Sequence, residues 1–171
     1  MQRRDFLNRS ARLGVGTAAA LASAGWTVSA LAQGQASGSN DPRKPVVQVW
    51  KDPNCGCCTE WVKHLEANGF GTQTFDTGNV GIRRRLGMPD ALGSCHTARA
   101  GTYVIEGHVP AADIHRLLRE KPQALGLSVP RMPIGSPGMD GPEYGGRQDP
   151  YDVLLVLRDG TTRVFSSYPR A

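Results

Sequence analysis

The stretch VVQVWKDPNCGCCTEWVKHLEANGF, residues 46–70, decides which fold we expect. Its first five residues are mostly apolar and β-branched, which is typical of a buried central strand. Its second half places apolar residues at helical spacing and ends in Asn-Gly, a pair that favours a helix C-terminus. The turn between the strand and the helix contains Cys55, Cys57 and Cys58, three of the four cysteines in the chain.

The chain from residue 70 to residue 125 continues this alternation of strands and helices. Strand patterns occupy 70–77 and two short runs within 95–107, and helix patterns occupy 79–89 and 110–122. The resulting order is strand, helix, strand, helix, strand, strand, helix. This is the order of an α/β core of the thioredoxin or glutaredoxin type, which we expect over 46–125.

Residues 126–171 are expected to extend this core. They begin with a loop rich in glycine and proline, 126–150, and loops of this length in compact domains are usually functional or disordered. Two strand-like runs then flank Asp159-Gly160, which predicts a β-hairpin. Because the chain ends in a hairpin, we expect the hairpin to pack on the core and to tether the loop over it.

Residues 1–32 have the features of a twin-arginine export signal. An Arg-Arg pair near the start is followed by an Ala-rich apolar run, and Ala30 and Ala32 provide the small residues of a cleavage site. These small residues favour removal of the signal over its retention as a membrane anchor. We therefore expect a periplasmic protein without stable membrane insertion after processing, in which 33–45 is a flexible linker.

The charge of the chain argues against binding to nucleic acid, and its length is enough for one domain. Removing residues 1–32 takes away four arginines and one aspartate, which leaves 16 basic and 14 acidic residues and lowers the net charge from +5 to +2. The remainder has no run of basic residues, so we expect no nucleic-acid partner. Its 139 residues are enough for one domain whose core needs no disulfide staples. In an oxidising compartment, the cysteines are therefore expected to be disulfides, metal ligands or redox groups.

The cysteine pattern allows two chemistries. Cys55 and Cys58 alone form C-x-x-C, the motif of thiol–disulfide oxidoreductases, whereas the inclusion of Cys57 gives C-x-C-C, which favours a soft metal. The positive end of a helix dipole stabilises thiolates, and thiolates serve both uses. In a thioredoxin-like core, the residues before the third strand of the chain lie beside this turn. That placement would bring Cys95 to the other three cysteines.

Four converging thiolates are more than one disulfide couple requires, and they favour Cu(I), with silver or zinc as alternative ions. The adjacent Cys57 and Cys58 suit thiolates that bridge several ions better than they suit one tetrahedral site. Two ordinary disulfides, or buried cysteines that act as small apolar side chains, are the simpler alternatives.

The histidines are weaker candidates for metal binding. His96 follows Cys95 directly, so its imidazole could bind or cap the cluster. Neighbouring side chains in a strand point to opposite faces, however, which argues against a shared site. For His108, near the end of the expected fourth strand, we expect a structural hydrogen bond. His64 and His115 fall within expected helices, on faces that we expect to be solvated.

Two methionines, Met132 and Met139, lie in the Gly/Pro-rich loop. A thioether is a suitable ligand for Cu(I) and tolerates an oxidising compartment. The alternative for each methionine is to fill a gap in the packing of the core. We also expect this loop to cover the cysteine site.

Four segments of the chain, within residues 46–168, carry a family resemblance. They are DPNCGCCTEWVKHLEANGF, SCHTA, YVIEGHVPAADI and GLSVPRMPIGSPGMD. Together they resemble the periplasmic CopG-type copper-resistance family, which is distinct from the DNA-binding repressors that share its name. The loop of that family commonly ends in Glu, where this sequence has Asp140.

The resemblance implies a thioredoxin-like fold in which Cys55, Cys57, Cys58 and Cys95 hold a cysteine-bridged multi-copper site, and a role in copper tolerance. We therefore expect a copper-binding protein; whether it is also a copper-dependent oxidoreductase that cycles the oxidation state of copper is left open. One alternative is a thiol–disulfide oxidoreductase that uses Cys55 and Cys58. The other is a copper carrier that hands its metal to a periplasmic copper-handling or efflux protein.

Overall fold

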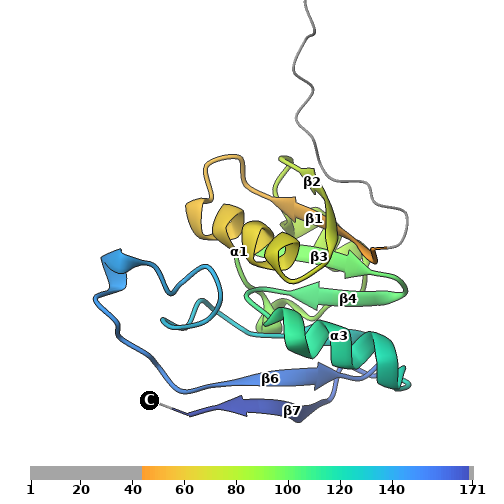
Figure 1. Ribbon diagram of the computed structural model, residues 1–171. Helices are drawn as coiled ribbons and strands as arrows, with labels where there is room; N and C mark the ends of the chain where they lie inside the picture. The colour runs from red at the N-terminus through yellow and green to blue at the C-terminus, as the bar shows by residue number, and fades with distance from the viewer. Residues whose placement is uncertain (1–43, 170–171) are drawn as a thin grey trace, which may run out of the picture. The chain divides into compact units, whose positions relative to one another are not determined.

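The computed structural model describes residues 44–169 as a mixed α/β fold around one seven-stranded sheet (Figure 1). The strands are β1 (Val46–Lys51), β2 (Gly71–Phe75), β3 (His96–Ala100), β4 (Tyr103–Glu106), β5 (Gly126–Ser128), β6 (Tyr151–Val156) and β7 (Thr162–Tyr168). The helices are α1 (Gly56–Ala67), α2 (Val80–Arg85) and α3 (Ala111–Glu120), with 3-10 turns η1 (Asp90–Leu92) and η2 (Pro142–Tyr144). The expected signal and nearly all of the expected linker lie outside the described residues.

The sheet has the order β2-β1-β3-β4-β5-β6-β7. Strand β1 pairs in parallel with β2 and antiparallel with β3, and β3 pairs antiparallel with β4. Strand β4 pairs in parallel with β5, and β5, β6 and β7 then pair antiparallel in succession. The element order expected for 46–125 is present, and so is the hairpin around Asp159-Gly160.

The short strand β5 was not expected from the sequence, which predicted that the loop starts at residue 126. This strand has only three residues, Gly126–Ser128, and it begins with a glycine, so it carries almost no pattern of its own. A side chain at Gly126 would collide with the carbonyl oxygen of Val104 on β4, and glycine therefore permits the pairing. Through β5, the C-terminal hairpin continues the same sheet instead of packing against its face.

The core lies between the sheet and the two longer helices, α1 and α3, which lie over the same face of the sheet (Figure 1). Its largest fully buried side chains include Trp61 and Leu65 of α1 and Ile114 and Leu117 of α3. A smaller cluster that contains Met88, Leu86 and Leu92 packs on Val104 and Val156. Because adjacent residues of β4 belong to the two clusters, this strand is buried on both faces, which explains its continuous apolar run. Among the described residues, no helix combines the length and the apolar character needed to cross a membrane.

The C-terminal hairpin is attached to α3 by polar contacts. Asp113 is almost fully buried and accepts hydrogen bonds from the hydroxyl groups of Ser166 and, at 2.7 Å, Tyr168. The guanidinium of Arg116 lies 3.6 Å from the ring centroid of Phe165. These contacts fix both ends of the segment between β5 and β6, because β5 is held in the sheet and the hairpin is held on α3.

Candidate metal centre

The turn before α1 positions three cysteines at the start of that helix. The backbone N–H of Cys55 donates to the carbonyl of Asp52 at 3.1 Å, and the Asp52 carboxylate accepts from the N–H of Asn54 at 2.8 Å. Cys55 is the N-cap residue, and Cys57 and Cys58 belong to the first helical turn. Their sulfurs therefore lie where helix N–H groups and the helix dipole favour negative charge.

The fourth cysteine, Cys95, immediately precedes β3 and lies beside this turn. Its Sγ atom is 3.9 Å from Sγ of Cys57, which is 3.6 Å from Sγ of Cys55. Sγ of Cys58 is 3.7 Å from the carbonyl oxygen of Cys95. All four sulfurs lie within 4.8 Å of one another, so the fold brings together the four cysteines that the sequence singled out.

The four cysteines differ in their bonding. Cys55 and Cys58 form a disulfide, whereas Cys57 and Cys95 are free and partly buried. Burial, together with the neighbouring Cys57, raises the pKa of Cys95 to about 12. Cys95 is therefore a neutral thiol at neutral pH, and a metal ion that binds it must displace a proton.

His108 points its ring at the sulfur of Cys95. Its Nε2 atom is 3.0 Å from Cys95 Sγ, and its Nδ1 atom is 2.7 Å from the carbonyl oxygen of Pro137. Because a carbonyl only accepts hydrogen bonds, we assign the proton to Nδ1, which leaves the lone pair of Nε2 facing the sulfur. Burial lowers the pKa of His108 and so favours the neutral ring. The expected structural hydrogen bond is present, and it orients the ring as in histidines that bind metals.

His96 also contacts Cys95, which is one of the two alternatives that the sequence left open for this residue. Its ring is fully buried, and Nδ1 lies 3.4 Å from Cys95 Sγ, while Nε2 has no hydrogen-bond partner among the described residues. The alternation of side chains does not apply here, because β3 starts at His96 and Cys95 lies outside the strand. Burial and the nearby His108 lower the pKa of His96 well below its usual value. Cys95, His96 and His108 thus form a second ligand group that shares Cys95 with the first.

The loop after β5 covers the start of α1. Gly138 has φ +84°, and a Cβ atom there would lie 2.6 Å from the carbonyl oxygen of Cys57 and 2.8 Å from the N atom of Trp61. Only a glycine permits so close an approach of the two backbones. The same loop supplies the Pro137 carbonyl that orients His108. The loop therefore lies against the backbone of Cys57 at the start of α1, and whether it covers the four sulfurs stays a prediction.

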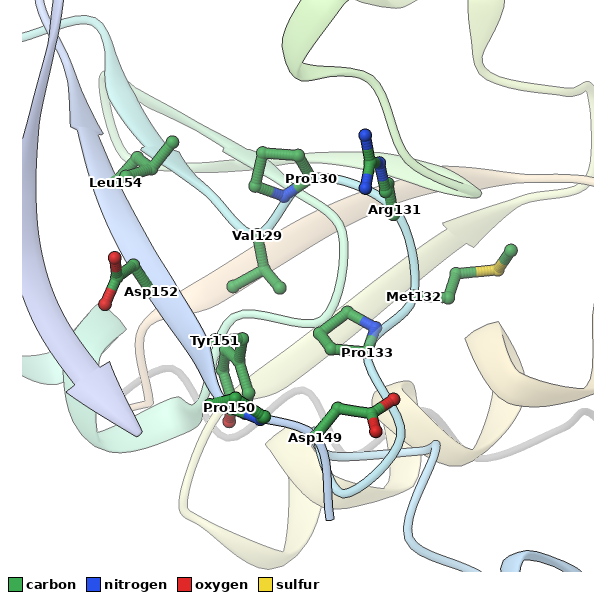
Figure 2. A pocket seen from close by; sticks show the side chains of 10 residues that line it. All are labelled: Val129, Pro130, Arg131, Met132, Pro133, Asp149, Pro150, Tyr151, Asp152 and Leu154. Atoms are coloured by element: carbon green, nitrogen blue, oxygen red, sulfur yellow. The ribbon is translucent and has the colours of Figure 1, made fainter. Parts of the chain in front are cut away.

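The two loop methionines have different surroundings. The thioether of Met139 accepts a hydrogen bond from the hydroxyl of Tyr144 at 3.3 Å. Met132 is 46% exposed and lies at the edge of a surface pocket of about 460 Å³ (Figure 2). The residue before it, Arg131, accepts a hydrogen bond on its carbonyl from the hydroxyl of Ser94. This contact links the pocket to the peptide that leads to Cys95.

A buried ion pair that the sequence analysis missed holds the peptide before Cys95. Oε1 of Glu106 accepts from Nε of Arg83 at 2.9 Å and from the N–H of Ser94 at 2.7 Å. Arg83 also donates through Nη2 to the carbonyl of Ser94 at 2.6 Å. Burial raises the pKa of Glu106, and the hydrogen bonds it accepts and the charge of Arg83 oppose that rise. The sequence offered one signal for this ion pair, which is that Glu106 is a charged residue in the otherwise apolar run YVIEG.

The two histidines expected on solvated faces have structural contacts instead. Nε2 of His64 accepts from the N–H of Ala111 at 3.1 Å, which satisfies a free donor at the start of α3. His115 stacks on Phe70 with ring centroids 4.1 Å apart. Both histidines lie outside the two ligand groups around Cys95.

Comparison with known proteins places this centre in a family. Residues 92–139 match the family described as "Protein of unknown function, DUF411", a segment that includes Cys95, His108 and Gly138. Two solved structures, named "Copper resistance protein copG- Form 1" and "Copper resistance protein copG- Form 2", are each 46% identical to this chain. Each match covers 74% of this chain and 99% of the other, with a TM-score of 0.68. No curated protein matches the chain. Identity at this level over almost the whole of the other chain shows that this protein belongs to the CopG copper-resistance family.

Proposed function

We propose that this protein, once its Cys55–Cys58 disulfide is reduced, binds copper as several Cu(I) ions held by the thiolates of all four cysteines, Cys55, Cys57, Cys58 and Cys95, and that it serves copper tolerance in the periplasm. The observation that carries the proposal is the convergence of all four sulfurs within 4.8 Å. Thiolate sulfur is a soft ligand that suits Cu(I). The names of the two similar structures support a role related to copper.

The arrangement of the first four strands supports a thioredoxin-like core for this site. In the order β2-β1-β3-β4, strands β2 and β1 are parallel, β3 is antiparallel to both β1 and β4, and α1 follows β1. The cysteine turn joins β1 to α1, and Cys95 lies just before β3. This geometry places thiolates from two distant segments at one helix N-terminus.

Several ions fit these ligands better than one. Cys57 and Cys58 are neighbours in the chain, so their sulfurs cannot easily take two corners of one tetrahedron. Cys95 belongs both to the group of four cysteines and to the group that contains His96 and His108. A sulfur shared by two ligand groups is suited to bridge two ions. We therefore propose a cluster of copper ions that are bridged by thiolates. Silver or zinc would find the same donors.

The mixture of ligands supports a change in the oxidation state of copper at this site. Thiolates favour Cu(I), whereas imidazole nitrogen binds copper in either state. His108 Nε2 faces Cys95 Sγ at 3.0 Å, so the two donor types meet at one sulfur. We therefore include copper oxidation and reduction in the proposed function.

A second candidate function is thiol–disulfide exchange, which the Cys55–Cys58 disulfide at the start of α1 favours. In this alternative, metal-free protein would reduce or isomerise disulfides in a client protein. An insulin-reduction assay with metal-free protein separates the two, because turnover that is lost in Cys55→Ser would support exchange.

The experiment that tests copper binding measures metal and thiols in the same sample. Protein is purified without oxygen from copper-fed cells, and its copper content is compared with the number of titratable thiols before and after copper removal. We expect more than one copper per chain, all four thiols blocked in the copper form, and a large loss of copper in Cys95→Ser. The matched control, His115→Gln, alters a histidine outside the ligand groups and should retain full copper. Less than one copper per chain with four free thiols would contradict the proposal.

A further inference from the structure

We propose that His64 is a pH-sensitive switch between helix α1 and two other segments. Its neutral ring holds the start of α3, and its protonated ring releases α3 and pairs with Asp140 of the loop after β5. The inference goes beyond copper binding, because neither residue belongs to the two ligand groups around Cys95. It makes the attachment of α3 to α1 dependent on pH.

The neutral ring of His64 closes the N-terminal end of α3. The backbone N–H of Ala111, the first residue of that helix, donates to Nε2 of His64 at 3.1 Å. Nε2 therefore carries a lone pair, which places the single proton of the ring on Nδ1. The N-cap residue is Pro110, which makes no side-chain cap, and Ala111 is only 1% exposed. The imidazole thus satisfies a buried donor that the helix itself leaves free.

Protonation of His64 removes this acceptor. An imidazolium carries N–H groups on both nitrogens, so Nε2 can no longer accept from Ala111. Its positive charge would also lie at the positive end of the α3 dipole, which repels it. Burial lowers the pKa of His64, and the charge of Asp140 opposes this change. The ring is therefore neutral at neutral pH and becomes charged in acid.

Asp140 is the carboxylate that can pair with the protonated ring. Its charge is the one that favours protonation of His64. Its Oδ1 atom accepts from the N–H of Gly138 at 3.0 Å, and Gly138 lies against α1, so the loop holds the carboxylate beside that helix. Glu60 precedes His64 by one turn of α1, but it is already paired with Lys63 at 2.7 Å.

The release of α3 should be local, because other contacts keep the helix in place. Nε1 of Trp61 on α1 donates to the carbonyl of Val109, just before α3, at 2.9 Å. On α3, the carboxylate of Asp113 is bound by two hydroxyl groups of the C-terminal hairpin, and Nε2 of His115 lies 2.8 Å from the carbonyl oxygen of Asn68. Acid should therefore open the hydrogen bond at the first residue of α3 without detaching the helix.

The test follows the amide of Ala111 and the ring of His64 in the wild-type full chain. Hydrogen exchange of that amide is measured by NMR from pH 8 to pH 4, and each rate is divided by the intrinsic exchange rate at the same pH. The ring chemical shifts report protonation. We expect protection of the amide to fall by about tenfold, with the same midpoint as the ring. This midpoint should lie below the ordinary pKa of histidine, because burial favours the neutral ring.

Two results in the wild type would overturn the inference, and neither depends on the folding of a variant. One is protection of the Ala111 amide that stays constant while the ring of His64 titrates. The other is a ring that stays neutral down to pH 4.

Three variants assign the effect to His64. His64→Gln should keep the amide of Ala111 protected throughout, because a glutamine oxygen can accept its hydrogen bond and does not titrate. Asp140→Asn should move the midpoint to lower pH, because the charge that favours the imidazolium is lost. His115→Gln is the control and should keep the wild-type pH dependence. An equal loss of protection in His64→Gln and the wild type would assign the effect to another group, such as His108, and would overturn the inference.

Discussion

Cys95 is the residue on which the contacts of the candidate metal centre converge. Its sulfur lies within 4 Å of Cys57 Sγ, His96 Nδ1 and His108 Nε2. The sequence predicted that Cys95 lies beside the other cysteines, which the structure confirms, but it did not predict that both histidines contact the sulfur, because those contacts depend on how β3 and β4 pack beside the turn.

Copper binding should depend on pH through the proton of Cys95. Burial raises the pKa of Cys95 to about 12, so below that pH the thiol is neutral and each binding event at this sulfur releases one proton. The Cu(I) affinity should therefore increase as pH rises, by about tenfold per pH unit for this proton alone. Competition with a Cu(I) chelator at pH 6, 7 and 8 measures the slope of the logarithm of the Cu(I) affinity against pH. Cys95→Ser should lower the slope by one proton, and an unchanged slope in that variant would show that the sulfur does not bind copper.

His108→Gln should weaken Cu(I) binding by about 10- to 100-fold, the usual effect of removing a group that binds or supports a metal ligand. The reason is that Nε2 is the donor nearest to Cys95 Sγ, and a glutamine cannot place a nitrogen lone pair there. Chelator competition measures the affinity, and His115→Gln serves as the control because His115 contacts Asn68 and Phe70. Equal affinities in the two variants would exclude His108 as a donor.

At the scale of elements, the site is where three segments meet: the start of α1, the residues before β3 and the loop after β5. Helix α1 and strand β3 were predictable from local signals. These are the spacing of apolar residues and, for the helix, the Asn-Gly pair at its C-terminal end. The fit between the elements was not predictable, since it depends on a backbone contact at Gly138 and on a buried ion pair at Glu106.

Gly138→Ala should lower the free energy of unfolding by more than a positive φ alone explains. An alanine at positive φ costs about 1 kcal/mol, and the collision of its Cβ with α1 should add about 1–3 kcal/mol. Gly145→Ala is the matched control, because Gly145 has φ +61° and open space around its Cβ position. Urea unfolding of both variants measures the difference. Equal losses would mean that the loop does not press on α1.

Glu106→Gln should destabilise the fold by about 3 kcal/mol or more, because it leaves the buried guanidinium of Arg83 without its counter-charge. It should also loosen the peptide at Ser94 and so lower copper affinity. Asp90→Asn is the control: it removes the exposed pair between Asp90 and Arg84, 3.2 Å long, and should change stability by about 0.5 kcal/mol or less. Thermal unfolding with and without Cu(I) measures both effects.

At the scale of the whole molecule, the seven-stranded sheet joins the cysteine-bearing half of the chain to the C-terminal hairpin. Strand β5 is the link, and contacts of Asp113 with Ser166 and Tyr168 fix the hairpin to α3. The segment between β5 and β6, which lies against the start of α1, is thereby held at both ends.

The proposed location of the protein in the periplasm depends on the export signal expected in residues 1–32. Replacing Arg3 and Arg4 together with lysine should retain the protein in the cytoplasm, because the arginine pair is the feature that a twin-arginine export signal requires. Cell fractionation followed by immunoblotting measures the distribution. A double Arg9→Lys and Arg12→Lys variant makes the same charge-conserving substitutions outside the pair and should still be exported. Export of both variants would contradict the proposal.

The sequence by itself determined the order of elements over 46–125, the hairpin at Asp159-Gly160 and the residue types of the site, because periodicity, turn residues and cysteine spacing are properties of neighbouring residues. Only the tertiary structure decided that β5 joins the sheet, that His96 and His108 face Cys95, and that Gly138 lies against α1. These features arise from contacts between segments far apart in the chain, such as His108 with Pro137, 29 positions away. Such contacts follow from the packing of elements against one another, and no local pattern encodes them.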